Sequence, residues 1–207
     1  MPLTTRSEDE QLFRDMVRGF AEEKVKPHVM EMDRAGKLPR ELIDELFALG
    51  VMGIEIPTVY GGAGANFLMA ILAIEELARV DPAVAVCVDV QNTLVNNALV
   101  RWLTPAQQER FFPRLTRNTV GAYALSESSS GSDAFAMQTQ ARLDGDSFVL
   151  NGGKMWITNG AEAGLYLLFA NADPSKGYKG ITGFIVERDS PGFSVGKKED
   201  KLGIRAS

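Results

Sequence analysis

The sequence has 207 residues, enough for one large domain or two small ones; 45% of them are hydrophobic and 24% are charged. Its formal net charge of −5 disfavours an electrostatic binder of nucleic acid, because such proteins present a basic face. No apolar run predicts a transmembrane helix, and the acidic N-terminus lacks the apolar core of a signal peptide. We expect a cytoplasmic globular protein that binds neither nucleic acid nor membrane.

The first 118 residues have the apolar periodicity of helices. Capping boxes at Ser7 and Thr104 predict the starts of the first and last of these helices. The helix after Asp81 is hydrophobic on nearly all sides, which predicts a central position in its domain. Glu75 and Glu76 are expected on a solvated helix face. The expected helices cover residues 8–27, 41–49, 66–80, 82–102 and 105–115, and Pro27 is expected to end the first.

From residue 119 the sequence changes to the pattern of short strands. Asp144-Gly145-Asp146 predicts a hairpin turn. The final residues do not resemble a domain end, so we expect the sequence to stop inside its second domain. The predicted fold is α+β, with a helical domain over 1–118 and a truncated antiparallel β-barrel over 119–207. The expected strands are 121–125, 138–143, 147–150, 154–158, 165–170, 182–186 and 193–196.

Cysteine and histidine each occur once. A single cysteine excludes an intrachain disulfide and suits a reducing cytosol. Cys87 lies in an apolar run, which favours a buried thiol over a nucleophile. His28 has no cysteine partner, so the usual zinc clusters are excluded and no metal site is expected.

Residues 123–135 read Tyr-Ala-Leu-Ser-Glu-Ser-Ser-Ser-Gly-Ser-Asp-Ala-Phe. Composition alone is typical of a flexible linker. A strand enters the stretch directly, however, and the carboxylates of Glu127 and Asp133 are spaced to accept hydrogen bonds from main-chain amides. Gly131 permits a positive φ or a close approach of the backbone, and neighbouring amides and hydroxyls can hold an anion. Linker and ligand loop remain equally open from these residues alone.

A second stretch, residues 154–160, reads Lys-Met-Trp-Ile-Thr-Asn-Gly. It predicts a strand that ends in an Asn-Gly turn, with Trp156 in the core. Alternation along a strand would place Trp156 and Thr158 on one side, where a ring and a hydroxyl together could hold a flat heterocycle. Core packing is the favoured alternative. The sequence has no dinucleotide fingerprint, P-loop or nucleophile elbow.

Six stretches, in this order, resemble landmarks of one enzyme family. They are Val59-Tyr-Gly-Gly-Ala-Gly64, Gln91-Asn-Thr-Leu-Val95, Tyr123–Asp133, Lys154-Met-Trp-Ile-Thr-Asn159, Gly177-Tyr-Lys-Gly-Ile-Thr182 and Lys201-Leu-Gly-Ile-Arg-Ala-Ser207. The chain resembles the acyl-CoA dehydrogenases, most of all the short/branched-chain members, over essentially its whole length. Their layout is a helical domain, a middle β-barrel and a C-terminal four-helix bundle. The bundle is absent here, and with it the glutamate that serves most members as the base, so no catalytic residue is expected up to Ser207.

The resemblance implies α,β-dehydrogenation of an acyl-CoA with FAD as cofactor. Electrons would pass to an electron-transferring flavoprotein, and the protein would form a homo-oligomer, a tetramer or a dimer. Ser132 and Tyr178 would also contact the acyl-CoA. The residues implied in FAD binding are Tyr123, Ala124, Leu125, Ser126, Gly131, Ser132, Trp156, Ile157 and Thr158.

The helix after Asp81 carries the hint about the substrate. Ala85 takes the place of an arginine that, in relatives acting on dicarboxylic acyl groups, meets the distal carboxylate. An apolar, short or branched acyl group is therefore expected, with Val86 and Val90 narrowing its pocket. Ordinary core packing explains the two valines equally well. Two other functions stay open: an oxygen-using flavin enzyme of the same fold, and an inactive fragment that binds FAD or acyl-CoA.

Overall fold

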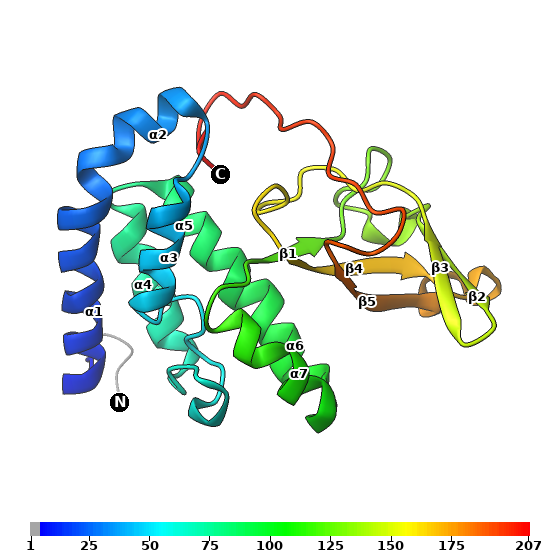
Figure 1. Ribbon diagram of the computed structural model, residues 1–207, viewed down its shortest axis with the longest axis horizontal. Coiled ribbons are helices and arrows are strands. Elements are labelled where there is room, and N and C mark those ends of the chain that lie inside the picture. The colour runs from blue at the N-terminus through cyan, green and yellow to red at the C-terminus, as the bar shows by residue number, and fades with distance from the viewer. Residues whose placement is uncertain (1–4) are drawn as a thin grey trace. The chain divides into compact units, whose positions relative to one another are not determined.

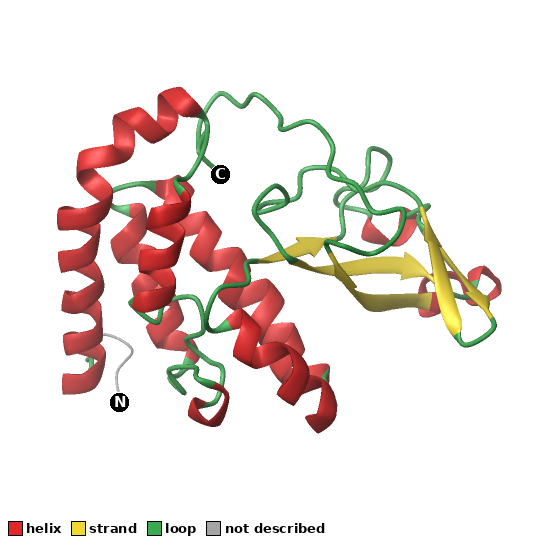
Figure 2. Cartoon of the chain, viewed as in Figure 1, coloured by secondary structure: helices red, strands yellow, loops and turns green. Residues whose placement is uncertain are grey.

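A computed structural model describes residues 5–207, which form two compact units. The helical unit runs to Val120 and includes Asp200–Ser207, and the β unit is Gly121–Glu199. Figure 2 shows nearly all the helices in the first unit and all the strands in the second. The α+β prediction is therefore confirmed.

The helical unit contains seven α-helices among its described residues (Figure 1). The capping box at Ser7 is confirmed: Glu10 donates its amide to the serine hydroxyl, and its carboxylate accepts the Ser7 amide. Thr104 and Gln107 form the second box. The helices are α1 (Glu8–Phe20), α2 (Val29–Ala35), α3 (Arg40–Ala48), α4 (Phe67–Ala78), α5 (Pro82–Asp89), α6 (Asn97–Trp102) and α7 (Pro105–Leu115).

The prediction that the first helix ends at Pro27 is wrong. The chain continues from α1 through a π-helical turn at Ala21–Val25 and a 3₁₀ turn at Lys26–His28 into α2. A change of hydrogen-bonding pattern before a proline accommodates its ring and its missing amide without ending the helix. The helix instead stops at Gly36, whose φ of 62° is left-handed.

The central helix of this unit runs from Pro82 to Trp102 as α5, a π-helical segment at Val90–Asn96, and α6. Its 21 residues include a window of mean hydropathy 1.2, so the helix is long and apolar enough to cross a membrane by length and composition alone. We had expected no apolar run of that length from the sequence. In the folded helical unit, 61% of that window is buried. The side chains of Gln91, Asn92 and Asn96 are fully buried and donate hydrogen bonds to main-chain carbonyls of the same unit. Burial and internal hydrogen bonding are typical of a core helix.

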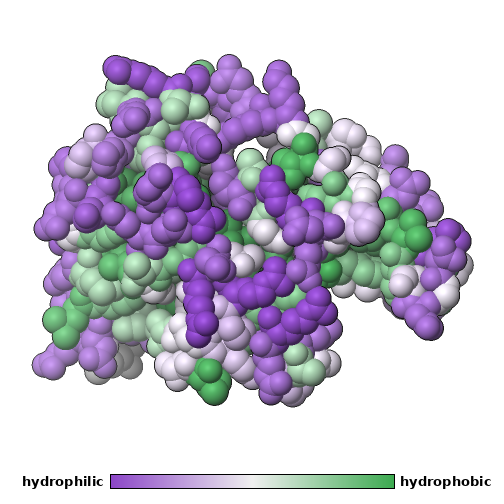
Figure 3. Space-filling view, viewed as in Figure 1, coloured by the Kyte–Doolittle hydropathy of each residue, from purple (hydrophilic) through white to green (hydrophobic). Residues whose placement is uncertain are grey.

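The expectation of a solvated face at Glu76 is also wrong. Its side chain is 3% exposed and accepts two hydrogen bonds from Arg18 of α1, at 2.9 and 2.8 Å. The hydrogen bonds from Arg18 hold the pKa of Glu76 below its ordinary value, although burial of the carboxylate acts in the opposite direction. This ion pair joins α1 to α4. Figure 3 shows hydrophilic and hydrophobic side chains interspersed on the visible face of the helical unit.

The β unit contains one mixed sheet, which corrects the prediction of an antiparallel barrel. β1 pairs with β4 in parallel and β2 meets β4 in parallel, whereas β2–β3 and β4–β5 are antiparallel. The sheet does not close within Gly121–Glu199. The long connection from β1 to β4 permits a crossover, and the Asp144–Ser147 turn permits only a hairpin. The strands are β1 (Gly121–Ala124), β2 (Gln140–Asp144), β3 (Ser147–Asn151), β4 (Leu165–Asn171) and β5 (Ile181–Glu187).

Two predicted strands are absent from the described residues. Residues 154–158 are irregular because Trp156 and Asn159 adopt left-handed φ values of 60° and 65°, which no strand allows. Residues 193–196 pair with no strand of the unit.

Candidate functional site

The serine-rich stretch is a folded loop between β1 and β2. Glu127 and Ser130 exchange main-chain hydrogen bonds of 2.9 and 3.2 Å, and the Ser130 hydroxyl donates to the Asp133 carbonyl at 2.9 Å. Ser130 is 2% exposed and Glu127 is 7% exposed. A flexible linker has neither buried polar side chains nor such internal bonds, so the linker alternative is set aside.

The carboxylate of Glu127 anchors this loop. It accepts hydrogen bonds from the amides of Gln138 and Thr139, at 2.6 and 3.1 Å, and from Lys154 Nζ at 2.7 Å. The side chains of Glu127 and Lys154 are only 5% and 7% exposed. Burial raises the pKa of Glu127, but the bonds from Lys154, Thr139 and Gln138 outweigh it and lower the pKa to about 2. Glu127 is therefore ionised at neutral pH.

Residues 154–159 are fastened to β1 and to the loop on both sides of Trp156. On one side, the Met155 amide donates to the Ser126 carbonyl at 2.9 Å and Lys154 Nζ donates to the Leu125 carbonyl at 3.0 Å. On the other, Asn159 Nδ2 donates to the Gly121 carbonyl at 3.1 Å. These bonds hold the intervening Trp156–Thr158 stretch in place even though it belongs to no strand.

Trp156 is not a core residue, contrary to one alternative drawn from the sequence. Its side chain is 63% exposed, while Ile157 and Thr158 are half-buried. Because no strand forms here, the expected alternation of Trp156 and Thr158 along a strand is wrong. The stretch instead presents an indole and a hydroxyl from an irregular turn.

The structure brings the other predicted loop residues together only in part. Tyr123 and Ala124 lie in β1, where the Tyr123 ring packs 5.0 Å from that of Phe169 and burial raises its pKa. Leu125 and Ser126 follow at once and are half-buried. Gly131 is exposed and lacks the positive φ that we considered, and a Cβ there would meet no atom within 4 Å.

Tyr178 lies beside an aromatic residue that the sequence did not single out. Its ring centroid is 5.1 Å from that of Phe135, with an angle of 35° between the ring planes. Phe135 and Tyr178 are 68% and 58% exposed, which is unusual for two rings in contact. The pair joins the end of the serine-rich loop to the turn at Pro174–Gly180.

Val86 and Val90 lie in the helical unit, on consecutive turns of the central helix. Val90 is 6% exposed and Val86 is half-buried. Ala85 is 3% exposed. This burial suits packing within the helical unit as well as it suits an apolar wall.

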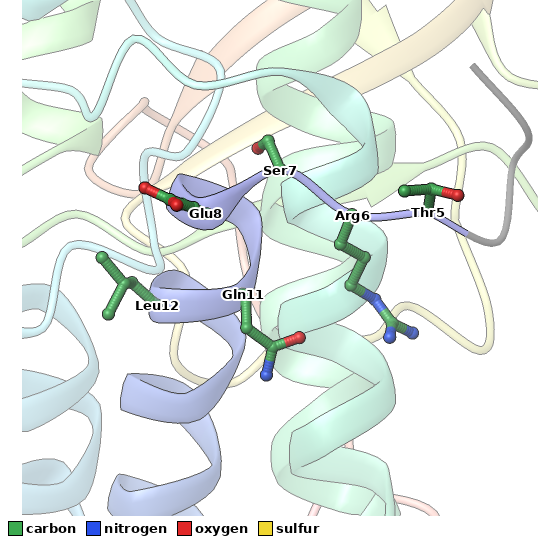
Figure 4. Close-up of a pocket in the computed structure, with 6 residues that line it drawn as sticks. All are labelled: Thr5, Arg6, Ser7, Glu8, Gln11 and Leu12. Atoms are coloured by element: carbon green, nitrogen blue, oxygen red, sulfur yellow. The ribbon is translucent and has the colours of Figure 1, made fainter.

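A hollow near the start of α1 contains none of the predicted site residues. Its lining is Thr5, Arg6, Ser7, Glu8, Gln11 and Leu12 (Figure 4). It is wide open to solvent, unlike the enclosed pockets in which small ligands usually bind.

The residues of the β unit fit a flavin cofactor in their chemistry. The hydroxyls of Ser126, Ser132 and Thr158 make no hydrogen bond to another residue in the described part of the chain, so all three can donate to a ligand. The exposed indole of Trp156 offers an apolar face to a flat ring. The expectation that the Glu127 carboxylate accepts main-chain amides is confirmed. Sequence reasoning missed the pairing of Glu127 with Lys154, the contact of Phe135 with Tyr178 and the anchoring bond of Asn159.

Comparison with known proteins places the chain in a family. Residues 7–119 match the model of the acyl-CoA dehydrogenase N-terminal domain, and residues 122–207 match that of the middle domain. A probable short/branched chain specific acyl-CoA dehydrogenase of Dictyostelium discoideum is 56% identical over 207 residues, which are 100% of this chain and 50% of that protein.

Two solved structures are similar as well. A structure described as an electron transferring flavoprotein of Acidaminococcus fermentans matches with a TM-score of 0.95 and 41% identity, over 98% of this chain and 54% of that one. A glutaryl-CoA dehydrogenase of Mycobacterium smegmatis, in complex with FADH2, matches with a TM-score of 0.89 and 36% identity, over 97% and 51%. The chain thus spans about half the length of these relatives. It belongs to the acyl-CoA dehydrogenase family.

Proposed function

We propose that the protein carries out FAD-dependent α,β-dehydrogenation of a short or branched acyl-CoA. The observation that carries this proposal is the double anchoring of residues 154–159 to β1 and the serine-rich loop. It presents the Trp156 indole and the free hydroxyls of Ser126 and Thr158 from one small, ordered region. The relative crystallised with FADH2 and the short/branched-chain relative support the cofactor and the substrate class.

Each residue of the region has a defined task in this proposal. Trp156 and Ile157 pack against the flavin ring, Leu125 and Ser126 line one edge of it, and Thr158 donates a hydrogen bond to it. Tyr123 and Ala124 hold the strand from which the loop departs. Gly131 and Ser132 lie near the pyrophosphate. When bound, FAD accepts the hydride that leaves Cβ of the substrate.

The acyl-CoA is assigned to Ser132 and Tyr178, with Val86 and Val90 toward the acyl group. Removal of a proton from Cα is the difficult step, because that C–H bond is a weak acid and charge develops on the thioester oxygen. The base is not assigned to any residue up to Ser207. We further propose transfer of electrons to an electron-transferring flavoprotein, homo-oligomerisation as a tetramer or dimer, and a cytoplasmic location.

The test is a titration of full-length wild-type protein and its Thr158→Ala variant with FAD and then with butyryl-, 2-methylbutyryl- and octanoyl-CoA. We expect the variant to change the spectrum of the bound flavin and to slow its reduction. Thr182→Ala is the matched control, since Thr182 is an exposed threonine of β5. An unchanged spectrum and rate for Thr158→Ala would remove Thr158 from the site, and a preference for octanoyl-CoA would overturn the short-chain assignment. Rapid reaction of the reduced protein with oxygen would favour an oxidase.

A further inference from the structure

The buried ion pair between Glu127 and Lys154 joins the two segments to which the proposed function assigns the flavin. Its Nζ–Oε1 distance is 2.7 Å, and both side chains are almost completely removed from solvent. A buried pair of this kind contributes little net stability compared with an apolar replacement, but loss of one partner leaves an uncompensated charge. Its position therefore calls for an explanation beyond stability.

The two segments have few other connections. Besides the pair, the described structure links residues 125–126 to residues 154–158 by the Met155 amide to the Ser126 carbonyl and by Lys154 to the Leu125 carbonyl. Trp156 has a left-handed φ of 60°, which costs energy in a residue other than glycine. Such a conformation persists where neighbouring contacts hold it, and the hydrogen bonds of Lys154, two residues away, are among those contacts.

Lys154 also acts on the peptide group between Leu125 and Ser126. Its ammonium donates to the carbonyl oxygen of that group at 3.0 Å. A charged donor on the carbonyl polarises the peptide and makes the N–H on its other side a stronger donor. That N–H belongs to Ser126 and makes no hydrogen bond within the described residues.

We propose that Glu127 and Lys154 are positioning residues for the cofactor. Glu127 holds Lys154, and Lys154 fixes the serine-rich loop against residues 155–158 and polarises the Leu125–Ser126 peptide, whose N–H is then directed to the ligand. The inference rests on the proposed function, and neither residue touches the reacting atoms.

The experiment compares variants of the full-length protein by FAD affinity, by the visible spectrum of the bound flavin and by amide hydrogen exchange of the apoprotein. Lys154→Met and Glu127→Gln are expected to weaken FAD binding at least about tenfold and to shift the flavin spectrum. Lys154→Arg retains the charge and is expected to recover most of the affinity. In the apoprotein of Lys154→Met, the amides of Thr139 and Met155 lose protection.

Glu76→Gln is the matched control, because Glu76 is an equally buried, ion-paired carboxylate in the helical unit. It is expected to lower stability but to leave FAD affinity within about twofold and the flavin spectrum unchanged, because Glu76 makes no contact, in the described part of the chain, with the two segments assigned to the flavin. If Lys154→Met fails to fold, Glu127→Gln and Lys154→Arg carry the comparison. Wild-type affinity and spectrum in Glu127→Gln and Lys154→Met, or an equal loss in Glu76→Gln, would overturn the inference and leave the proposed function standing. Failure of the wild-type protein itself to bind FAD would overturn both.

Discussion

Replacement of Asn92 tests the account of the helical core. Its fully buried amide joins the central helix to the segment that follows α3: Oδ1 accepts the Ile54 amide at 3.0 Å, and Nδ2 donates to the carbonyls of Val51 and Val88 at 2.7 and 2.9 Å. Asn92→Ala removes three hydrogen bonds of about 1 kcal/mol each and leaves buried groups unpaired. We expect the free energy of unfolding to fall by about 3–5 kcal/mol.

Asn92→Asp sharpens the test because it retains the shape of the side chain. A carboxylate there faces two carbonyl oxygens where Nδ2 donated, so its pKa in the folded protein must rise. A raised pKa means that the variant is most stable below the ordinary pKa of aspartate and loses stability as the pH rises through the folded value. Urea unfolding followed by the helical circular dichroism signal measures both variants. A loss below about 1 kcal/mol in Asn92→Ala, or stability of Asn92→Asp that does not depend on pH, would refute the reasoning.

Three further predictions concern the β unit, backbone packing and the substrate. Glu127 has a pKa of about 2 against an ordinary 4.5, so its ionised carboxylate contributes at most about 3 kcal/mol to the free energy of unfolding. This contribution is present above pH 4.5 and is lost as the pH falls toward 2. The difference in urea stability between wild type and Glu127→Gln should therefore shrink over that range, and a constant difference would contradict the prediction. A Cβ on Gly62 would lie 2.0 Å from the carbonyl oxygen of Ile56, so Gly62→Ala should lower the free energy of unfolding by more than about 2 kcal/mol. Gly19 lies in α1 and a Cβ there would meet no atom within 4 Å, so Gly19→Ala should raise the free energy of unfolding by about 0.5–1 kcal/mol. Equal effects of the two variants in thermal unfolding would contradict the close packing at Gly62. Phe135→Ala should raise the KM for acyl-CoA several-fold with little change in kcat if its contact with Tyr178 supports the substrate, and an unchanged KM would separate the pair from the site.

The helical unit was largely predictable because its signals are local. The capping boxes at Ser7 and Thr104 mark helix starts through side chains three residues apart, and both are confirmed. Pro27 misled because the sequence does not reveal that a π turn and a 3₁₀ turn carry the chain past it. Glu76 misled because its burial depends on Arg18, which is 58 residues away in the sequence.

The candidate site was predictable in its segments but not in its construction. The loop at 123–135 and the stretch at 154–160 were identified from composition and resemblance, yet the strand expected at Trp156 does not form. Apolar alternation cannot reveal a left-handed φ that is held by tertiary bonds on either side. The parallel pairing of β1 with β4 likewise depends on a connection of some forty residues, which leaves no local pattern.

The most direct test of the central claim is single-turnover reduction of the FAD-loaded full-length protein by 2-methylbutyryl- or butyryl-CoA without oxygen. The account predicts that the visible absorbance of the flavin disappears and that the matching 2-enoyl-CoA is formed in equal amount. No uptake of FAD, or bound flavin that no acyl-CoA reduces, would contradict it.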